Sequence, residues 1–357
     1  MVFSELKFFS GKRVFITGHT GFKGTWLTQI MVKSGAIVCG YSLPTIDDKS
    51  HFNGLGLKDL ITHVEGDICD EVGLIDAIVS FKPDIVFHLA AQALVKLAYA
   101  DPVTTFSTNV MGSLNILQAV NNCSSVRSMI YVTSDKCYEN VEWEWGYRET
   151  DTLGGHDPYS ASKAAAEIVF SSYTRSFYQK RAQFGAASVR AGNVIGGGDY
   201  SIGRVVPDCI RAIRHNNPIE LRNPQSTRPW QHVLEPLSGY ILLAQKLFED
   251  PQKYAHPWNF GPGSQELRNV GDVAKKIVEV YGQGSISCGV VPSDFHEANL
   301  LQLNCDLAYN KLGWHPRWDV DKTLKLTADW YRLVDIGTSM QEVTNTHIDD
   351  YFGGSND

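Results

Sequence analysis

Short, continuously apolar runs alternate with helical patterns through the first 190 residues of the chain. The runs that we expect to be strands are 13–17, 36–40, 61–65, 85–89, 129–133 and 186–190, and the segments that we expect to be helical are 24–33, 102–121 and 159–178. Apolar strands that are separated by helices belong to a parallel sheet covered on both faces. Right-handed crossovers then predict an α/β fold with a doubly wound sheet, whose ligands bind at the carboxyl ends of the strands.

The pattern loosens after residue 190, where Gly, Pro, Asn and Arg become frequent and the expected helices are 236–248 and 270–281. We therefore expect two domains. The first consists of residues 1–190, and 234–257 is expected to return to it. A smaller substrate-binding domain is expected from 191–233 and 258–357.

Composition limits the partners of the chain. Its 357 residues carry 32 basic and 39 acidic side chains, a formal net charge of −7. A mildly acidic chain without a basic tract argues against nucleic acid and anionic membranes as partners. We expect neither a signal peptide nor a membrane span, because no apolar stretch has the required length. Seven scattered cysteines fit reduced thiols better than disulfides or a metal site, so we expect a cytoplasmic protein that binds no metal.

A glycine-rich turn, GHTGFKG at 18–24, connects the first expected strand to the first expected helix. Backbone N–H groups and the helix dipole at such a turn bind a pyrophosphate, although the spacing differs from the G-x-G-x-x-G of many dehydrogenases. The context favours a dinucleotide cofactor in a Rossmann domain over a turn without a ligand. The expected cofactor contacts in this turn are Gly18, Thr20, Gly21, Phe22, Lys23 and Gly24.

Two later segments bear on the adenosine half of such a cofactor. An acidic residue after the second strand favours NAD and an arginine favours NADP, but the chain has GYSLP at 40–44 and so does not discriminate. After the third expected strand, Asp67 and Ile68 have the form of an adenine contact. Asp67 as the N-cap of a following helix is an equally open alternative.

Tyr159 and Lys163 are four positions apart in the expected helix 159–178, so their side chains share one face. A tyrosine titrates near pH 10, and its use as a base at neutral pH requires a pKa lower by about 3, or about 4 kcal/mol. The ammonium of Lys163 and a positively charged nicotinamide both favour the phenolate. YxxxK is frequent by chance, but its place after the glycine turn and the fifth strand favours a catalytic pair over surface residues.

Polar side chains also follow the fifth expected strand, where Thr133 precedes Ser134, Asp135 and Lys136. These residues lie at the carboxyl edge of the sheet, toward which the tyrosine is expected to point. We expect a polar group of the active site here. The alternative is a capped turn with a solvated Asp135–Lys136 pair.

Together these motifs resemble the extended short-chain dehydrogenase/reductase family over nearly the whole chain. HLAA at 88–91, TNVMG at 108–112, RPWQHV at 228–233 and LGWHP at 312–316 add to the resemblance, as do Arg190, Asn193 and Gly196. It implies a bound NAD(P), taken here as NAD, an N-terminal Rossmann domain and a C-terminal pocket for a nucleotide sugar. The further cofactor contacts that we expect are Asp67, Ile68, Leu89, Ala90, Ala91, Thr108, Thr133, Tyr159 and Lys163.

Within that family the chain is similar to the sugar-nucleotide 4,6-dehydratases, and GFKG at 21–24 and SDKCY at 134–138 resemble the branch acting on CDP-glucose. The implied reaction converts CDP-D-glucose to CDP-4-dehydro-6-deoxy-D-glucose and water. The relatives that act on dTDP-glucose and GDP-mannose usually carry an acidic residue at the position of Lys136. We hypothesise that Lys136 removes the C5 proton and Asp135 protonates the departing C6 hydroxyl, and one residue performing both steps stays open.

The expected substrate contacts are Gln92, Ser134, Asn193, Arg204 and Arg228. A planar guanidinium binds phosphate in a fork, which makes Arg228 the first candidate for the substrate pyrophosphate. Arg204 and Arg268 are equally compatible with surface positions.

Two other functions stay open, a 4-epimerase or decarboxylase on the same scaffold and a non-catalytic dinucleotide-binding sensor. The Asp135–Lys136 pair favours elimination. The presence of all four side chains expected for catalysis argues against a sensor; they are Ser134, Asp135, Tyr159 and Lys163. The resemblance also implies a homodimer or homotetramer, in which helices 102–121 and 159–178 pair across a two-fold axis. Apolar residues for that seam, or for the core, are Val110, Leu114, Leu117, Ile168, Val169 and Phe170.

Overall fold

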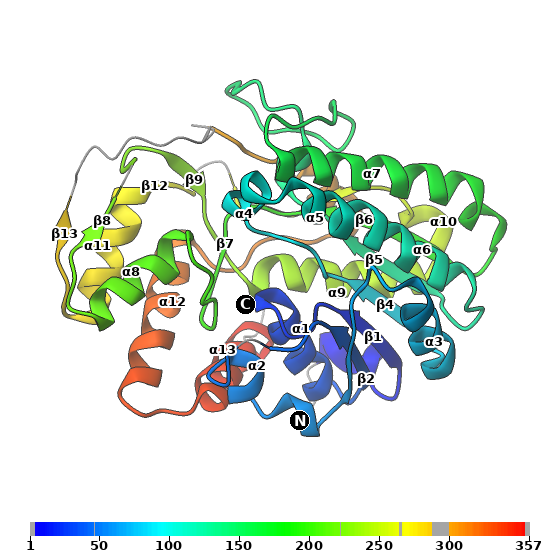
Figure 1. The fold of residues 1–357 in the computed structure, drawn as a ribbon, viewed down its shortest axis with the longest axis horizontal. Helices are drawn as coiled ribbons and strands as arrows, with labels where there is room; N and C mark the ends of the chain where they lie inside the picture. The colour runs from blue at the N-terminus through cyan, green and yellow to red at the C-terminus, as the bar shows by residue number, and fades with distance from the viewer. Residues whose placement is uncertain (1–3, 46, 222, 264–265, 288–299, 354–357) are drawn as a thin grey trace.

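The computed structural model describes residues 4–45, 47–221, 223–263, 266–287 and 300–353. Its largest element is a seven-stranded parallel sheet in the order β11-β6-β5-β4-β1-β2-β3 (Figure 1). The strands are β1 (Arg13–Thr17), β2 (Ile37–Ser42), β3 (Thr62–Glu65), β4 (Ile85–His88), β5 (Ser128–Val132), β6 (Gly185–Arg190) and β11 (Trp258–Asn259). The strand order reverses between β1 and β4, where a doubly wound sheet opens a crevice at its carboxyl ends. The expected fold class is confirmed.

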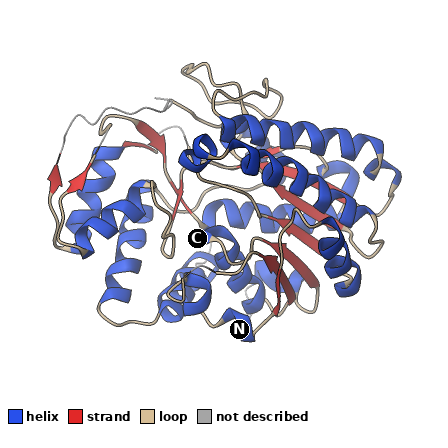
Figure 2. Ribbon diagram, in the orientation of Figure 1, coloured by secondary structure: helices blue, strands red, loops and turns tan. Residues whose placement is uncertain are grey.

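Helices cover both faces of this sheet (Figure 2). The principal ones are α1 (Phe22–Lys33) and α9 (Leu234–Glu249) on one face and α3 (Glu71–Phe81), α6 (Ser113–Asn121) and α7 (Pro158–Ser176) on the other. Successive side chains of β1 serve different cores, because Val14 packs with Trp26 of α1 while Phe15 packs with Leu74 of α3. This two-sided burial explains why the strand sequences are apolar without alternation.

The segment expected as one helix at 102–121 is helical throughout but not uniform. It consists of α5 (Pro102–Phe106), the π-helical turn η3 (Ser107–Gly112) and α6. The turn carries Asn109, which is 1% exposed and whose side-chain amide donates to the Ser162 hydroxyl of α7 at 2.9 Å. The irregular turn therefore connects this helical segment to the helix that carries Tyr159.

A smaller part of the chain lies beside the carboxyl ends of the sheet (Figure 1). Its strand pairs are β7 (Val194–Ile195) with β10 (Gln231–His232), β8 (Ile219–Glu220) with β13 (Ile286–Ser287), and β9 (Thr227–Pro229) with β12 (Leu267–Asn269). Its helices are α8 (Val205–Arg214), α11 (Val270–Tyr281) and α12 (Val320–Asp335), while α13 (Met340–Gly353) lies against α1, where the Gln29 side-chain amide donates to Asn345 at 2.8 Å. The helix expected at 270–281 is confirmed. Helices α8, α12 and α13 were not among those that we expected.

Short elements complete the description. They are η1 (Ser4–Phe9), α2 (His51–Gly54), η2 (Leu57–Asp59), α4 (Val95–Ala100), η4 (Asp135–Cys137), η5 (Tyr178–Lys180), α10 (Pro251–Tyr254) and η6 (Ala308–Leu312). Of these, η4 holds the polar group after β5, and α4 follows the turn after β4.

The segment 234–257 lies on the sheet, where the Ser128 hydroxyl of β5 donates to the backbone carbonyl of Ala244 in α9 at 2.8 Å. Trp258 and Asn259, which we assigned to the substrate domain, form β11 and pair with β6 in parallel. The division into two domains stays a prediction.

Some features concern the described residues only. Six cysteines lie there, and each is a free thiol. No helix in these ranges has the length and apolar character needed to cross a membrane. The same ranges hold no group of three or more His, Cys, Asp or Glu side chains that suits a metal ion.

Glu235 is a buried carboxyl in the first turn of α9 that ties the C-terminal segment to this helix. Its oxygens accept hydrogen bonds from the backbone N–H of Trp318 at 2.8 Å and from the Tyr351 hydroxyl at 2.6 Å. Burial raises the pKa of Glu235 to about 7, and these bonds offset only part of that effect. A carboxyl with a raised pKa binds more protons in the folded than in the unfolded chain, so its contribution to stability decreases as pH rises from about 4.5 to about 7.

We therefore expect the free energy of unfolding to decrease by about 1–3 kcal/mol between about pH 5.5 and about pH 8 on account of this group. Glu235→Gln should remove most of that dependence, because the amide does not titrate. Urea unfolding at the two pH values measures it, with Glu342→Gln on the exposed face of α13 as the control. A Glu235→Gln variant with the wild-type dependence on pH would contradict the assignment.

Candidate active site

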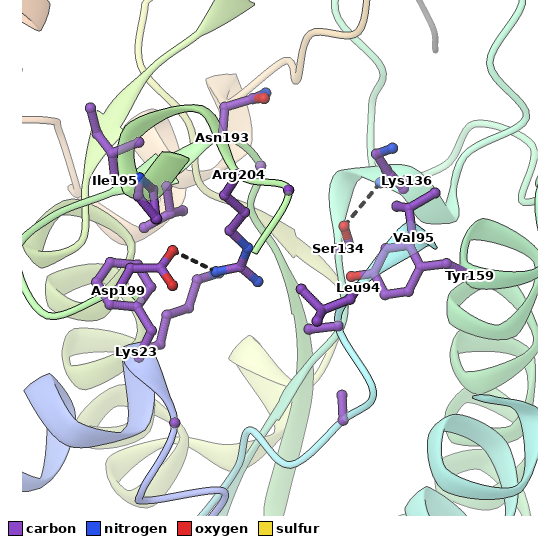
Figure 3. A pocket seen from close by; sticks show the side chains of 18 of the residues that line it. Lys23, Leu94, Val95, Ser134, Lys136, Tyr159, Asn193, Ile195, Asp199 and Arg204 are labelled. Carbon is purple, nitrogen blue, oxygen red and sulfur yellow. Dashed lines mark hydrogen bonds and ion pairs between the residues drawn. The ribbon is translucent and has the colours of Figure 1, made fainter. Parts of the chain in front are cut away.

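A cavity of about 800 Å³ opens at the carboxyl ends of the strands. Its walls come from the glycine turn after β1, the turns after β4 and β5, the first turns of α7 and the segments 191–196 and 202–209 of the smaller part. Every residue that we expected at the site lines this cavity except Gln92. The residues brought together thus come from many separate parts of the sequence (Figure 3).

Gln92 instead holds the turn after β4. Its side-chain oxygen accepts from the backbone N–H of Leu94 at 2.6 Å, and its side-chain amide donates to the Thr105 hydroxyl at 2.9 Å. Its own backbone N–H donates to the Asn109 side chain at 2.8 Å. These bonds occupy the polar atoms of Gln92, so its structural role is to shape the neighbouring wall.

Two glycines of the turn, Gly18 and Gly24, lie too close to neighbouring backbone to carry a side chain. Gly18 has a φ of +72°, and a Cβ on it would lie 2.7 Å from the backbone nitrogen of Ala90. A Cβ on Gly24 would lie 2.0 Å from the carbonyl oxygen of Gly18. Helix α1 begins directly after Gly21 without a side-chain cap, so its first N–H groups are available to an anionic ligand. This arrangement fits the pyrophosphate of a dinucleotide.

The adenosine end of the cavity has hydroxyl groups where other Rossmann folds carry an acid or an arginine. The Thr20 hydroxyl lies 2.7 Å from the Ser42 hydroxyl at the end of β2. Asp67 lines the cavity and accepts from the backbone N–H of Cys69 at 2.9 Å. The N-cap of α3 is Asp70, so the alternative assignment of Asp67 as the cap is wrong.

Ser134 and Tyr159 form the centre of one wall, with Lys136 above them (Figure 3). The Ser134 hydroxyl donates to Asp135 at 2.9 Å, accepts from the backbone N–H of Lys136 at 3.2 Å and is hydrogen-bonded with Tyr159. Burial raises the pKa of Tyr159 to about 12, while the Ser134 hydrogen bond and the charge of Arg204 lower it. The residues of the chain alone therefore do not produce the lower pKa that we expected for Tyr159.

Lys163 is 5% exposed and lies one turn after Tyr159 on α7. Burial lowers the pKa of Lys163 to about 8, and the charge of Glu167 opposes this effect. At pH 7 the side chain is therefore mostly an ammonium, as the expected role beside Tyr159 requires.

Asp135 packs against the backbone of the segment after β6. A Cβ on Gly192 would lie 1.7 Å from one carboxylate oxygen of Asp135, so only glycine leaves room for this side chain. The contact fixes the position of the carboxyl group relative to Ser134.

We expect Gly192→Ala to displace Asp135 and to lower kcat by about 10²-fold, because a misplacement of about 1 Å costs that much at a catalytic group. Folding and cofactor content should be retained. Steady-state kinetics measure the effect. Gly261→Ala is the matched control, since its Cβ would meet Cys305 Sγ at 3.5 Å and the Leu303 side chain at 3.7 Å, which are ordinary contacts. Wild-type turnover of Gly192→Ala would show that the place of Asp135 is unimportant.

The facing wall carries the cationic residues Lys23 and Arg204 (Figure 3). Arg204 donates to Asp199 at 2.8 Å, and both residues line the cavity. Asn193 has a φ of +53°, a left-handed conformation that is uncommon outside glycine, and it lines the cavity. Arg228 also lines the cavity, whereas Arg268 does not and pairs with Asp321 at 3.5 Å.

One buried group near the site was not among our expectations. Glu167 of α7 and Arg190 of β6 form an ion pair at 2.9 Å, and each side chain is 2% exposed. The sequence contained a signal for it, since Glu167 follows Lys163 by four positions and so shares its helix face.

Comparison with known proteins places this geometry in a family. A family model described as GDP-mannose 4,6 dehydratase matches residues 15–327 of the chain. The chain belongs to the GDP-mannose 4,6-dehydratase family. The expected resemblance to the extended short-chain dehydrogenases/reductases and their 4,6-dehydratases is thereby confirmed.

Members and structural neighbours of the GDP-mannose 4,6-dehydratase family differ in their similarity to the chain. A CDP-glucose 4,6-dehydratase of Salmonella typhimurium is 45% identical over 98% of this chain and 99% of its own length. A dTDP-D-glucose 4,6-dehydratase of Dictyostelium discoideum is 28% identical over 75% of this chain and 62% of its own length. The crystal structure of a dTDP-glucose 4,6-dehydratase from Bacillus anthracis with NAD has a TM-score of 0.76 at 20% identity and covers 92% of this chain and 98% of that one, which shows the shared fold.

Proposed function

We propose that the chain is an NAD-dependent CDP-glucose 4,6-dehydratase, a hydro-lyase that converts CDP-D-glucose to CDP-4-dehydro-6-deoxy-D-glucose and water. The observation that carries the proposal is the 45% identity to the Salmonella typhimurium enzyme over nearly both full lengths. We further place the reaction in bacterial deoxysugar biosynthesis for O-antigen and lipopolysaccharide.

The residues around the cavity fit NAD. The close-packed glycine turn and the uncapped start of α1 would hold its pyrophosphate, and Asp67 and Ile68 would flank its adenosine. The NAD complex of the Bacillus anthracis relative supports this cofactor. When bound, NAD accepts a hydride from the sugar and returns it later in the same turnover.

Tyr159 is proposed to remove the proton of the C4 hydroxyl. The Ser134 hydroxyl lies within hydrogen-bond reach of Tyr159 and would hold the C4 oxygen in line with it. Because burial raises the pKa of Tyr159 to about 12, proton acceptance requires positive charge nearby. Lys163 and Arg204 of this chain and the nicotinamide ring supply that charge.

Loss of water needs a base at C5 and an acid at C6. Lys136 and Asp135 are adjacent in η4 and both line the cavity beside Ser134. We propose Lys136 as the base and Asp135 as the acid, since these two side chains follow Ser134 directly at the cavity wall. The new C4 ketone acidifies the C5 proton, so elimination follows oxidation.

The pyrophosphate of the substrate is proposed to bind Arg228 and Asn193 in the smaller part. Arg204 is a weaker ligand because Asp199 already neutralises it. A guanidinium offers two parallel donors to a phosphate, which matches the proposed role of Arg228.

Incubation with a panel of sugar nucleotides tests the function. We expect CDP-glucose, and none of the other glucose or mannose nucleotides, to give the alkali-induced absorbance of a 4-keto-6-deoxy sugar. The cofactor extracted from the purified protein should be NAD. Formation of CDP-galactose without a keto sugar would instead support a 4-epimerase. Product from dTDP-glucose alone would refute the proposed preference for a cytosine nucleotide.

A homodimer or homotetramer and a cytoplasmic location stay predictions. Exposed apolar side chains on the two expected helices support a two-fold seam, since Val103 of α5 is 74% exposed and Ile168 of α7 is 59% exposed. Of the other seam candidates, Leu117 and Phe170 are buried in the core instead.

A further inference from the structure

Glu167 lies one turn after Lys163 on α7, and the proposed mechanism does not use it. Its side chain is 2% exposed. Its carboxylate oxygens accept hydrogen bonds from the Thr133 hydroxyl, from the Ser188 hydroxyl at 2.7 Å, and from Nε and Nη2 of Arg190, both at 2.9 Å. Four donors occupy the four lone-pair positions of a carboxylate, so this group is held as an anion in one orientation.

These hydrogen bonds join three elements of the proposed active site. Thr133 directly precedes Ser134 at the end of β5, Arg190 ends β6, and Glu167 shares α7 with Tyr159. Movement of the end of β5 relative to α7 would break bonds to a buried charge, which is costly. The carboxylate therefore holds the residue before Ser134 against the helix that carries Tyr159.

The same carboxylate acts on Lys163 through its charge. Residues four apart on a helix have Cβ atoms about 5–6 Å from each other. Burial lowers the pKa of Lys163 to about 8, and Glu167 is the largest influence that raises it. The other titratable groups that act on or respond to Lys163 are Cys137 of η4, His88 of β4 and Lys23 of α1. His88 is neutral because burial lowers its pKa to about 3, and Lys23 is a like charge, so neither replaces the carboxylate.

We propose that Glu167 is a positioning residue, which holds the end of β5 against α7 and keeps Lys163 an ammonium through its negative charge. The meaning of this role for catalysis rests on the proposed function. The test does not, because it measures the ionisation of Lys163 without a sugar nucleotide.

The ionisation of Lys163 is measured in the purified protein by NMR, following the ¹³C signal of labelled lysine Cε against pH. The signal is assigned by its loss in Lys163→Arg. We expect the midpoint to decrease by about one pH unit or more in Glu167→Gln, because a neutral amide no longer favours the ammonium. Glu167→Asp retains the charge and should keep a midpoint near the wild-type value, while its shorter side chain lowers kcat.

Ser188→Ala is the matched control, because it removes one hydrogen bond to the same carboxylate without removing charge. Its midpoint should equal that of the wild type. Glu167→Gln leaves Arg190 buried without its partner, so Glu167→Gln combined with Arg190→Gln provides an uncharged pair should the single variant not fold. That variant should show the same direction of change.

A wild-type midpoint in either folded Glu167→Gln variant overturns the proposal. A decrease in Ser188→Ala as large as that in Glu167→Gln also overturns it, because the effect would then come from packing rather than charge. Failure of the wild-type protein to convert CDP-glucose would refute the proposed function but leave this titration readable.

Discussion

Tyr159→Phe is expected to lower kcat for CDP-glucose by about 10³-fold with little change in KM. The substitution removes only the hydroxyl, and the ring, which is 8% exposed, keeps its packing against the cavity wall. Loss of the proton acceptor at the C4 oxygen stops oxidation of the sugar, and no later step proceeds without that oxidation. Steady-state kinetics together with the NAD content of the purified variant measure the effect.

Tyr173→Phe is the control for this substitution. Tyr173 lies on the same helix, but its hydroxyl donates to Gln118 and does not line the cavity. We expect wild-type turnover from it. Turnover retained by Tyr159→Phe would remove the tyrosine from the mechanism and leave the proton of the C4 hydroxyl to another group.

Lys136→Met is expected to abolish exchange of the C5 hydrogen with solvent and to lower dehydration by about 10²-fold or more. Methionine matches the length of the lysine side chain but cannot accept a proton. Lys136 lies in η4 directly after Asp135, and both residues line the cavity next to Ser134. We therefore expect the C5 hydrogen of a sugar bound at Ser134 to lie near these two side chains. Turnover in D₂O followed by mass spectrometry of the sugar measures incorporation at C5.

Lys96→Met is the control for the lysine substitution, because Lys96 of α4 also lines the cavity but is not part of the proposed chemistry. It should retain deuterium incorporation at saturating substrate. Undiminished incorporation in Lys136→Met would remove Lys136 from the role of base and transfer that role to Asp135. Asp135→Asn then distinguishes the two, since it should lose incorporation only in that case.

Local sequence signals predicted the first half of the fold well. The apolar runs of β1 and β6 need no knowledge of their neighbours, because burial on both faces is visible in the residues themselves. The pairing of Tyr159 with Lys163 was equally predictable, since helix geometry alone puts positions four apart on one face. The glycine turn was recognisable from its place between a strand and a helix.

The helices that we missed were less evident, but some carried signals. Helix α3 has Asp70 as its N-cap and Leu74, Ile78 and Phe81 on its buried side. Helix α12 starts after an Asp319 cap. The segments before these helices have the composition of loops. Most residues of α12 and α13 are polar, so the apolar residues that pack against the core were not recognised as one helix face.

Gln92 shows a different reason for a missed role. Its position beside Ala91 in the turn after β4 suggested a contact with substrate, but the hydrogen bonds to Leu94, Thr105 and Asn109 direct its polar atoms into the protein. Partners of a side chain that come from another part of the chain do not follow from the spacing around it.

The amino-acid sequence alone determined the sheet, the glycine turn and the helical pair of phenol and amine, because each depends on residues within one or two neighbouring elements. Only the tertiary structure decided that Gly192 makes room for Asp135 and that Glu167 joins Arg190, Ser188 and Thr133. Such contacts form between residues far apart in the chain, where close packing and the need to pair a buried charge select the partner.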